Sequence, residues 1–180
     1  MVDEQTILAV DEIGNFTGKY IRKSVGHKGE GKRHLAISVL LYNSKDEVLL
    51  QKRKHKVFDD IWDVTGATHP LHLESGQDET VEEATLRCLS REYGIKEVAL
   101  KNHGFFNYFV KYGKLCENEH CAILVGEYNG RLNLNPEVGY GYKWMAKQEF
   151  LKDIEKNPKN YTAWAKEAVQ VLLASDFFNG

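Results

Sequence analysis

The sequence lacks the features that mark membrane-spanning and secreted chains. No apolar run approaches the roughly 20 residues that a membrane-spanning helix needs, and the acidic start MVDEQTILAV has no signal-peptide pattern. The three cysteines, Cys88, Cys116 and Cys121, are odd in number and form no CxxC pair, so no disulfide framework is expected. We therefore expect a cytoplasmic protein that does not engage a membrane.

The sequence also lacks a large excess of positive or negative charge, and it has no linker segments. The formal net charge is −2, so no basic field favours nucleic acid as a partner. The chain has no internal repeat, no low-complexity tract and no Pro/Ser-rich linker. Its 180 residues suit one domain, residues 1–180, that buries about two-thirds of its unfolded surface. Without coiled-coil heptads, we expect a monomer.

Strand patterns fill much of what is present. TILAVDEIGNFTGKYIRK predicts a hairpin around Asn15, and His34–Tyr42 and Glu47–Arg53 predict two strands around a polar turn. His34–Tyr42 is almost continuously apolar, which is typical of a strand that is buried on both faces. WDVTGATHPL begins like a strand and turns at Gly66. GFFNYFVKYGKLCENEHCAILVGEY predicts a hairpin that turns near Gly113.

The segment ETVEEATLRCLSREYGI carries the clearest helix pattern. Thr80 and Glu83 form a capping box, and Gly94 is a stop signal. By the 3.6-residue period, Glu92 falls within ~20° of the apolar stripe that begins at Val81. Glu92 therefore faces inward, or it is a rim residue whose carboxylate reaches solvent; the helix alone favours the rim.

Two further helices are predicted near the C-terminus, in KWMAKQEFLKDIEKN and TAWAKEAVQVLLASDFF. Strands that surround one strong helix, with helices added at the end, predict an α+β fold, a mixed α/β/α sandwich with additional C-terminal helices.

The segment CENEHC places two carboxylates on one face of a strand. Glu117 and Glu119 are one residue apart, so their side chains point the same way, roughly 7 Å from each other at ~3.3 Å per residue. Cys121 and Ile123 continue that face, and carboxylates on a core-facing side need protons, partners or a metal. The alternative is a solvated edge strand, which the pair alone favours slightly.

Three of the seven histidines occupy suggestive places. His27 lies in a Gly-rich segment, His34 opens the buried strand, and His69 follows the GATHP turn. Each one alone fits a hydrogen-bonded structural role, and their spacing is no compact metal motif. Three His and two Glu together would suit Zn²⁺ or Mn²⁺, but the sequence alone does not bring them together.

With these motifs in view, the chain resembles the type I isopentenyl-diphosphate isomerases of the Nudix superfamily. The resemblance runs from about Thr6 to about Leu173 and rests on GHKGEGKRHLAISVLLYNSKDEVLLQKR, the W…HP turn, the helix end REYGI, ENEHC and TAW. It implies a Nudix-type sandwich. It also implies an enzyme that moves a carbon–carbon double bond in a small-molecule diphosphate by adding and removing protons.

The resemblance assigns a role to each candidate site residue. It implies one Mn²⁺ or Zn²⁺ ion on five ligands, and a Mg²⁺ ion that bridges the substrate diphosphate and Glu92. It implies that Glu119 and Tyr108 exchange the proton and that Trp164 faces a cationic carbon. Lys23 and Arg53 match residues that bind the diphosphate. The five implied metal ligands are His27, His34, His69, Glu117 and Glu119.

Ala67 is the one large departure from the family pattern. The family has its catalytic cysteine two residues before this histidine, and an alanine methyl carries no exchangeable proton. Loss of a general acid or base typically costs ~10²–10⁴ in rate. Thr65 and Thr68 are poor bases, and another cysteine could substitute only if the fold brings it to position 67.

Two alternatives to the isomerase follow from this departure. One is a metal-dependent Nudix hydrolase of a nucleoside or isoprenoid diphosphate. Against the superfamily's hydrolysis motif, Glu79, Arg87 and Glu92 fit, whereas Cys88 and Arg91 replace two metal-binding glutamates and Leu73 replaces the first glycine. The other alternative is a non-catalytic isoprenoid diphosphate binder. Ala67 favours it, while Glu119, Tyr108 and Trp164 argue against it.

Overall fold

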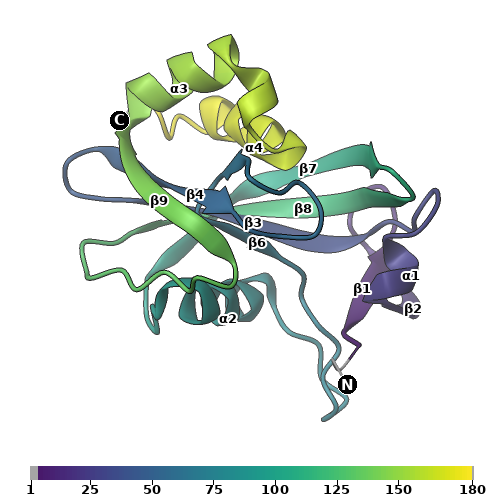
Figure 1. Cartoon of the computed structure of the whole chain (residues 1–180). Helices are drawn as coiled ribbons and strands as arrows, with labels where there is room; N and C mark the ends of the chain where they lie inside the picture. Colours follow the sequence, from purple (N-terminus) through teal and green to yellow (C-terminus); the bar gives the residue numbers. More distant parts are fainter. Residues whose placement is uncertain (1–3, 180) are drawn as a thin grey trace.

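A curled mixed β-sheet lies between helices in the computed structural model, which describes residues 4–179 (Figure 1). Helix α2 covers one face of the sheet, and α3 and α4 cover the other. No helix in this described part is long and apolar enough to cross a bilayer. The strands are β1 (Thr6–Val10), β2 (Phe16–Arg22), β3 (His34–Tyr42), β4 (Glu47–Arg53), β5 (Trp62–Asp63), β6 (Gly66–Thr68), β7 (Leu100–Tyr112), β8 (Leu115–Glu127) and β9 (Gly139–Ala146). The helices are α1 (Lys23–Gly26), α2 (Val81–Tyr93), α3 (Lys147–Lys156), a 3-10 turn η1 (Pro158–Asn160) and α4 (Ala163–Ala174).

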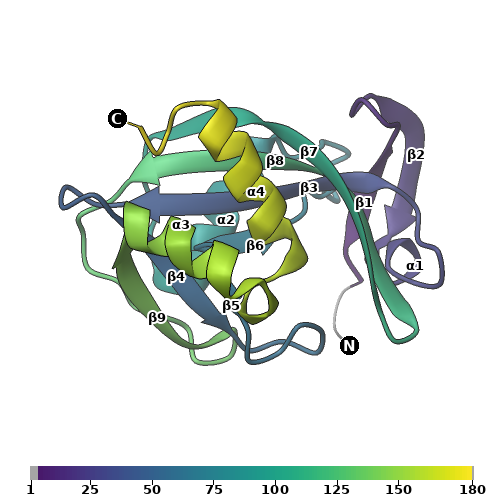
Figure 2. The ribbon, with the colours of Figure 1, turned by 90° about the horizontal axis from the view of Figure 1, so that it is seen from above.

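Strand β3 is the centre of the sheet. It pairs in parallel with β8 and antiparallel with β1, β4 and β6. Ala36 and Leu40 face the cluster under α3 and α4, while Val39 and Leu41 face α2. Its continuous apolar pattern is therefore explained by burial on both faces, as predicted. In the view from above, α4 crosses over β3 and β8 (Figure 2).

Helix α2 has the predicted ends. The Thr80 side chain accepts a hydrogen bond from the Glu83 backbone N–H, the Glu83 side chain accepts one from the Thr80 N–H, and Gly94 adopts φ 71°. Only a residue that tolerates a left-handed φ ends a helix in this way without strain. Glu92 is buried, so the inward-facing reading of this residue is correct and the rim reading is wrong.

Three local predictions need correction. The segment KWMA is not helical: Lys143–Ala146 is the end of β9, which pairs with β4, and the helix begins at Lys147. The strand around Trp62 breaks at Val64–Thr65, so Gly66 already belongs to β6. The short helix α1 before His27 was not predicted. Outside these segments, the hairpins and the α+β sandwich agree with the sequence prediction.

A candidate metal centre beside a proton-exchanging pair

The register of three strands brings the key carboxylate to its neighbours. In the parallel β3–β8 pair, His34 lies opposite Glu119, and in the antiparallel β7–β8 pair, Tyr108 lies opposite Glu119. Opposed residues of paired strands present their side chains to the same face. The Glu119 side chain therefore lies between an imidazole on one side and a phenol on the other.

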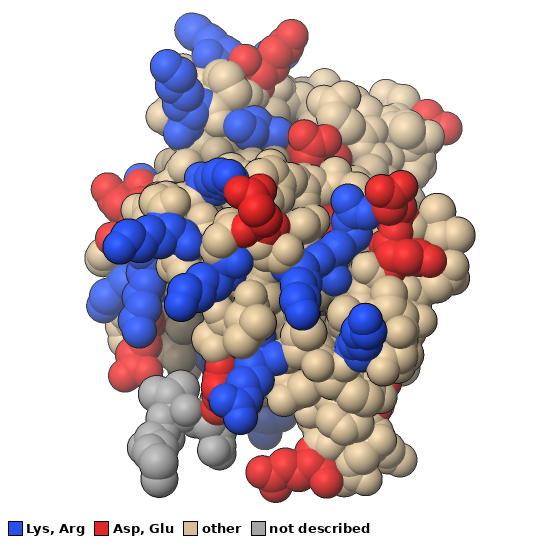
Figure 3. Space-filling model, turned by 90° about the vertical axis from the view of Figure 1, so that its right-hand side faces the viewer, with Lys and Arg blue, Asp and Glu red and all other residues tan. Residues whose placement is uncertain are grey.

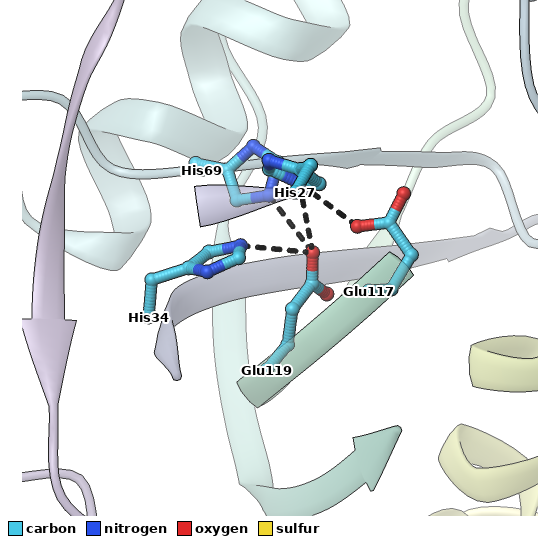
Figure 4. Close-up of side chains that lie close together, drawn as sticks. All are labelled: His27, His34, His69, Glu117 and Glu119. Atoms are coloured by element: carbon cyan, nitrogen blue, oxygen red, sulfur yellow. Dashed lines mark hydrogen bonds and ion pairs between the residues drawn. The ribbon is translucent and has the colours of Figure 1, made fainter. Parts of the chain in front are cut away.

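Five side chains converge around Glu119. They are His27, His34, His69, Glu117 and Glu119, and their ligand atoms all lie within 4.8 Å of one another (Figure 4). Glu119 Oε1 lies 2.8 Å from His69 Nε2, 3.4 Å from His34 Nε2 and 3.9 Å from His27 Nε2. Glu117 Oε2 lies 2.8 Å from His27 Nε2. The structure thus brings together residues from the end of α1, where His27 is the C-cap, from β3, from the segment after β6 and from β8, which sequence spacing could not do.

Backbone carbonyls orient two of the three imidazoles. His27 Nδ1 lies 2.7 Å from the Lys23 carbonyl oxygen, and His34 Nδ1 lies 2.7 Å from that of Lys32. A carbonyl accepts only from a protonated nitrogen, so Nδ1 carries the proton and Nε2 can present a lone pair to the centre. This arrangement is typical of metal-ligating histidines.

The charges in the cluster suit a cation at its centre. Burial raises the pKa of Glu117. Burial acts the same way on Glu119, but hydrogen bonds from the three histidines hold the pKa of Glu119 well below its usual value. Burial lowers the pKa of His27, and its bonds to Glu117 and Glu119 outweigh this and raise it to about 10. Without an ion, a proton on His27 balances the carboxylates.

Three buried polar atoms of the cluster residues, His34 Nε2, His69 Nδ1 and Glu117 Oε2, make no well-formed hydrogen bond among the described residues, although the first and third lie within ion-pair distance of another cluster side chain. Buried polar atoms without partners are costly and call for a ligand. Three imidazole nitrogens and two carboxylates form a donor set of the kind that borderline divalent ions bind. The cluster therefore fits a divalent metal ion.

Tyr108 contacts Glu119 on the side away from the histidines. Its hydroxyl donates a hydrogen bond to Glu119 Oε2, the oxygen that does not face the histidines. Burial and the negative charge of Glu119 raise the pKa of Tyr108 well above its usual value, so the phenol keeps its proton. The Tyr108 ring centroid lies 6.0 Å from that of Trp164, which places this pair beside the indole.

A buried carboxylate, Asp63, fixes the indole in place. Asp63 Oδ2 accepts hydrogen bonds from Trp164 Nε1 at 2.9 Å and from Arg53 at 3.0 Å, and Oδ1 accepts one from Thr162 at 2.8 Å. The Arg53 guanidinium stacks on the indole, 4.9 Å from its centroid, and Phe58 packs against the indole edge. Trp164 and Arg53 are therefore one rigid unit.

Position 67 faces the same side as this unit. Ala67 lies opposite Ser38 in the β3–β6 pair and packs with Trp164 and Tyr108 in the cluster under α4. A side chain on the preceding Gly66 would instead meet Cys88 and Glu92, which shows that neighbouring residues of β6 face opposite sides.

Of the three cysteines, only Cys121 lies on the face of the sheet that Ala67 shares with Trp164 and Tyr108. Cys88 lies on the α2 face, with its sulfur 4.0 Å from the Ala67 carbonyl oxygen. Cys116 is packed under the turn at Gly31, away from the cluster. Cys121 Sγ lies 3.4 Å from Ser38 Oγ, one strand removed from Ala67. Burial raises the pKa of the Cys121 thiol well above its usual value, so it remains neutral.

The remaining predicted residues lie outside the five-residue cluster. Lys23 is half-buried; burial lowers its pKa, while the charges of Glu117 and Glu119 raise it. Its ammonium lies 3.3 Å from the Gln5 side-chain oxygen. Glu92 is buried beneath Gly66. Lys and Arg side chains are prominent across the side of the molecule that carries α1 and the β7–β8 hairpin (Figure 3).

Asp63, Gln51 and Ser38 were missed by sequence reasoning. Asp63 and Gln51 are polar residues within predicted strands, where burial needs partners, and that was the available signal. Ser38 interrupts an apolar strand in the same way. Their partners are distant in the chain, so their roles required the structure.

Comparison with known proteins gives one consistent result. The family model described as NUDIX domain matches residues 32–165. "Isopentenyl-diphosphate Delta-isomerase" of Aliivibrio fischeri (strain MJ11) is 32% identical over 177 residues, which are 93% of this chain and 94% of that protein. "Isopentenyl-diphosphate Delta-isomerase 2" of Aromatoleum aromaticum is 29% identical over 98% of this chain and 91% of that protein.

Solved structures support the fold. A crystal structure of a Deinococcus radiodurans protein superposes with a TM-score of 0.70 and 16% identity, covering 93% of this chain and 99% of that one. A MutT protein from Methanosarcina mazei Go1 superposes with a TM-score of 0.59 and 16% identity, covering 82% and 93%.

Proposed function

The chain belongs to the NUDIX domain family and, within it, to the isopentenyl-diphosphate Delta-isomerases, and on this premise we propose that it interconverts isopentenyl and dimethylallyl diphosphate. The observation that carries the proposal is the contact between Tyr108 and Glu119 at the edge of the His/Glu cluster and beside Trp164. A proton-exchanging pair next to an aromatic face suits a reaction with a cationic carbon.

The residues on the Glu119 side handle the first proton. Tyr108, hydrogen-bonded to the Glu119 carboxylate, delivers its hydroxyl proton to the terminal alkene carbon, and the Tyr108–Glu119 pair takes up a proton from solvent after the reaction. The electron pair of the double bond forms the new C–H bond, and the positive charge develops at the neighbouring tertiary carbon. The Trp164 indole, which Asp63 orients, stabilises that charge through its ring face. Removal of a proton from the carbon nearer the diphosphate returns its C–H electrons as the new double bond.

The opposite side of the substrate has no proton carrier at residue 67. Ala67 contributes a methyl group, and the neutral Cys121 thiol lies beyond Ser38. We propose that a water molecule accepts the second proton there. A carbocation is acidic enough for a weak base, so the reaction proceeds, but at a rate that is lower by an amount within the ~10²–10⁴ typical of an acid/base group.

Binding of a divalent ion is proposed for the five-residue cluster. His27, His34 and His69 would hold Mn²⁺ or Zn²⁺ with Glu117 and Glu119, and the ion would supply positive charge that orders these carboxylates. Lys23 and Arg53 are proposed to bind the substrate diphosphate. Arg53 already shares its guanidinium between Asp63 and Trp164, so its role includes positioning the indole.

The proposal extends to the setting of the protein. We propose a monomer that acts on a small-molecule diphosphate in the cytoplasm and engages neither nucleic acid nor membrane. The small net charge of −2 supports this reading, since it offers no field for polyanions.

Proton and phosphorus NMR in D₂O test the function directly. The purified protein is loaded with Mn²⁺ or Zn²⁺, and unbound metal is removed until one ion per chain remains. The loaded protein is then incubated with isopentenyl diphosphate and Mg²⁺. Dimethylallyl diphosphate with deuterium at the methyl carbon is the expected product. Release of inorganic phosphate or pyrophosphate without isomerisation would instead establish hydrolysis and overturn the proposal.

The hydrolase alternative has less support from the residues of α2. Cys88 is buried with a neutral thiol, and Arg91 brings a positive charge, where a hydrolase would use carboxylates. The same incubation with Tyr108→Phe is a control: it should reduce isomerisation, whereas a hydrolysis that does not use this phenol would continue unchanged.

A further inference from the structure

Both oxygens of the Glu92 carboxylate are already occupied. Glu92 is 4% exposed; its Oε1 lies 2.5 Å from an Arg91 guanidinium nitrogen, and its Oε2 accepts a hydrogen bond of 2.9 Å from Gln51 Nε2. Gln51 is itself 3% exposed, and its amide also bonds the Tyr93 hydroxyl at 3.1 Å. The Gln51 N–H group is fixed by these contacts and points at the Glu92 Oε2 lone pair that a metal ion would need.

The surroundings of Glu92 do not form a magnesium site. Mg²⁺ beside a substrate phosphate is usually held by waters and one or two carboxylates, so Glu92 would need a carboxylate oxygen free to bind it. One helical turn earlier lies Cys88, whose thiol is kept neutral because burial raises its pKa well above the usual value. Within residues 4–179, the group of ligand side chains close enough to share an ion is the His/Glu cluster, and Glu92 is not a member. The residues present at Glu92 therefore do not fit a second divalent ion.

We propose that the Arg91 guanidinium replaces a second divalent ion at Glu92 and binds the substrate diphosphate directly. This inference rests on the proposed function for the identity of the diphosphate ligand. Glu92 then acts as a positioning residue that holds the Arg91 guanidinium. The positive charge that faces the diphosphate is carried by this side chain and not by a metal ion.

Arg91 has the free donors that this role needs. A guanidinium carries five N–H groups, and the recorded side-chain contact of Arg91 uses a single nitrogen, on Glu92. The Arg91 side chain is 51% exposed, so its remaining N–H groups can reach a ligand. Arg87 differs: it spends its donors on Glu79 and on the His69 carbonyl, and so holds the metal-site segment.

Arg91 also shares its region with other cationic groups. Burial lowers the pKa of Lys23, the charges of Glu117 and Glu119 raise it, and the nearby charges of Arg91 and Arg87 lower it. Burial lowers the pKa of His55 to about 4, assisted by Arg53, Lys23 and Arg91. Positive groups that disfavour one another's protonation form a site that a dianionic or trianionic ligand relieves. A planar guanidinium that can bond two phosphate oxygens suits such a ligand.

The test measures binding of inorganic pyrophosphate by calorimetry. The protein is first loaded with Mn²⁺, freed of excess ion and checked for metal content, then titrated with and without millimolar Mg²⁺, with correction for Mg²⁺–pyrophosphate complexes in solution. Arg91→Gln and Glu92→Gln are compared with the parent. Arg131→Gln, an exposed loop arginine, is the matched control for loss of one charge.

Four results are expected. Mg²⁺ changes the affinity of the parent less than about threefold; Arg91→Gln weakens binding about 10- to 100-fold, the value of a charge-assisted hydrogen bond of 1.5–3 kcal/mol; and Arg131→Gln binds like the parent. Glu92→Gln stays insensitive to Mg²⁺. Mg²⁺ that tightens binding tenfold or more in the parent and not in Glu92→Gln, or an Arg91→Gln protein that binds like the parent, would overturn the inference.

The binding test is independent of turnover. A protein that binds pyrophosphate through Arg91 but yields no dimethylallyl diphosphate would refute the proposed isomerase and leave the inference intact. A working isomerase whose pyrophosphate affinity depends on Mg²⁺ and Glu92 would support the proposed isomerase and refute the role of Arg91. Thermal unfolding of Arg91→Gln serves as the folding control; a lower Tm is expected because the buried Glu92 loses its cationic partner, so binding is measured well below the unfolding transition of each variant.

Discussion

A thiol placed at position 67 should accelerate isomerisation. Ala67 faces the cluster under α4, opposite Ser38 and on the same side as Trp164 and Tyr108. Ala67→Cys adds one sulfur atom on that side without changing the backbone of β6. It supplies a proton-exchanging group where the parent protein relies on water.

The size of the gain follows from the cost of the missing group. A positioned acid or base contributes ~10²–10⁴ in rate. Since the new thiol is not supported by surroundings adapted to it, we expect kcat to rise about 10²–10³-fold, which is about 2.7–4 kcal/mol of barrier. Initial rates are measured by proton NMR as dimethylallyl diphosphate forms from isopentenyl diphosphate.

Ala67→Ser is the matched control. A hydroxyl adds nearly the same volume on the same side but exchanges protons poorly, so its rate should stay within about threefold of the parent, far below the gain from an acid/base group. The reasoning is refuted if Ala67→Cys turns over no faster than the parent, or if Ala67→Ser gains as much as Ala67→Cys. In the second case the space at residue 67, not its acid/base chemistry, would limit the parent.

Four further outcomes are expected. Tyr108→Phe should lower kcat about 10²-fold while leaving pyrophosphate affinity unchanged by calorimetry, because the phenol contacts Glu119 alone among the charged groups. Asp63→Ala should reduce the free energy of unfolding in urea by about 3–5 kcal/mol, because it leaves a buried guanidinium unpaired. Mn²⁺ at about 100 times its Kd should raise Tm by about 5–10 °C, from ~2.7 kcal/mol of linkage, and His34→Ala should abolish that rise. Hydrogen bonds from Tyr161 and a neighbouring amide hold the pKa of Asp153 below its usual value. The stabilisation that these bonds give is therefore present above the unfolded-state pKa, near 4, and is lost as the pH falls through the lower folded-state pKa. The free energy of unfolding of Asp153→Asn should therefore fall less steeply with acid than that of the parent.

Local patterns predicted the elements that local forces build. The capping box at Thr80 and the stop at Gly94 gave α2 its ends, and the unbroken apolar run gave β3 its two buried faces. The alternation of Glu117 and Glu119 gave their common face. Each of these rests on residues within one or two turns or strands, where periodicity carries the information.

The site itself depends on distant pairings. Glu119 meets His34 only because β8 joins β3 in parallel, and no pattern within either strand states that register. The same limit explains the error at Trp144, where four residues before α3 pair with β4 as part of β9. Asp63 drew no prediction, since its partners Thr162 and Trp164 lie about a hundred residues later.

The carboxylate of Asp63 therefore has a consequence for how the protein is made. Its bonds to Thr162 and Trp164 join residues 99 and 101 positions apart. During synthesis the sheet strands emerge first, and the Trp164 indole leaves the ribosome after all of them. Contacts across such long loops form late because closing the loop costs entropy. The last member of the His/Glu cluster, Glu119, therefore precedes in synthesis the helices that cover one face of the sheet, and a chain terminated after β9 would lack the α3 and α4 side chains that complete this core.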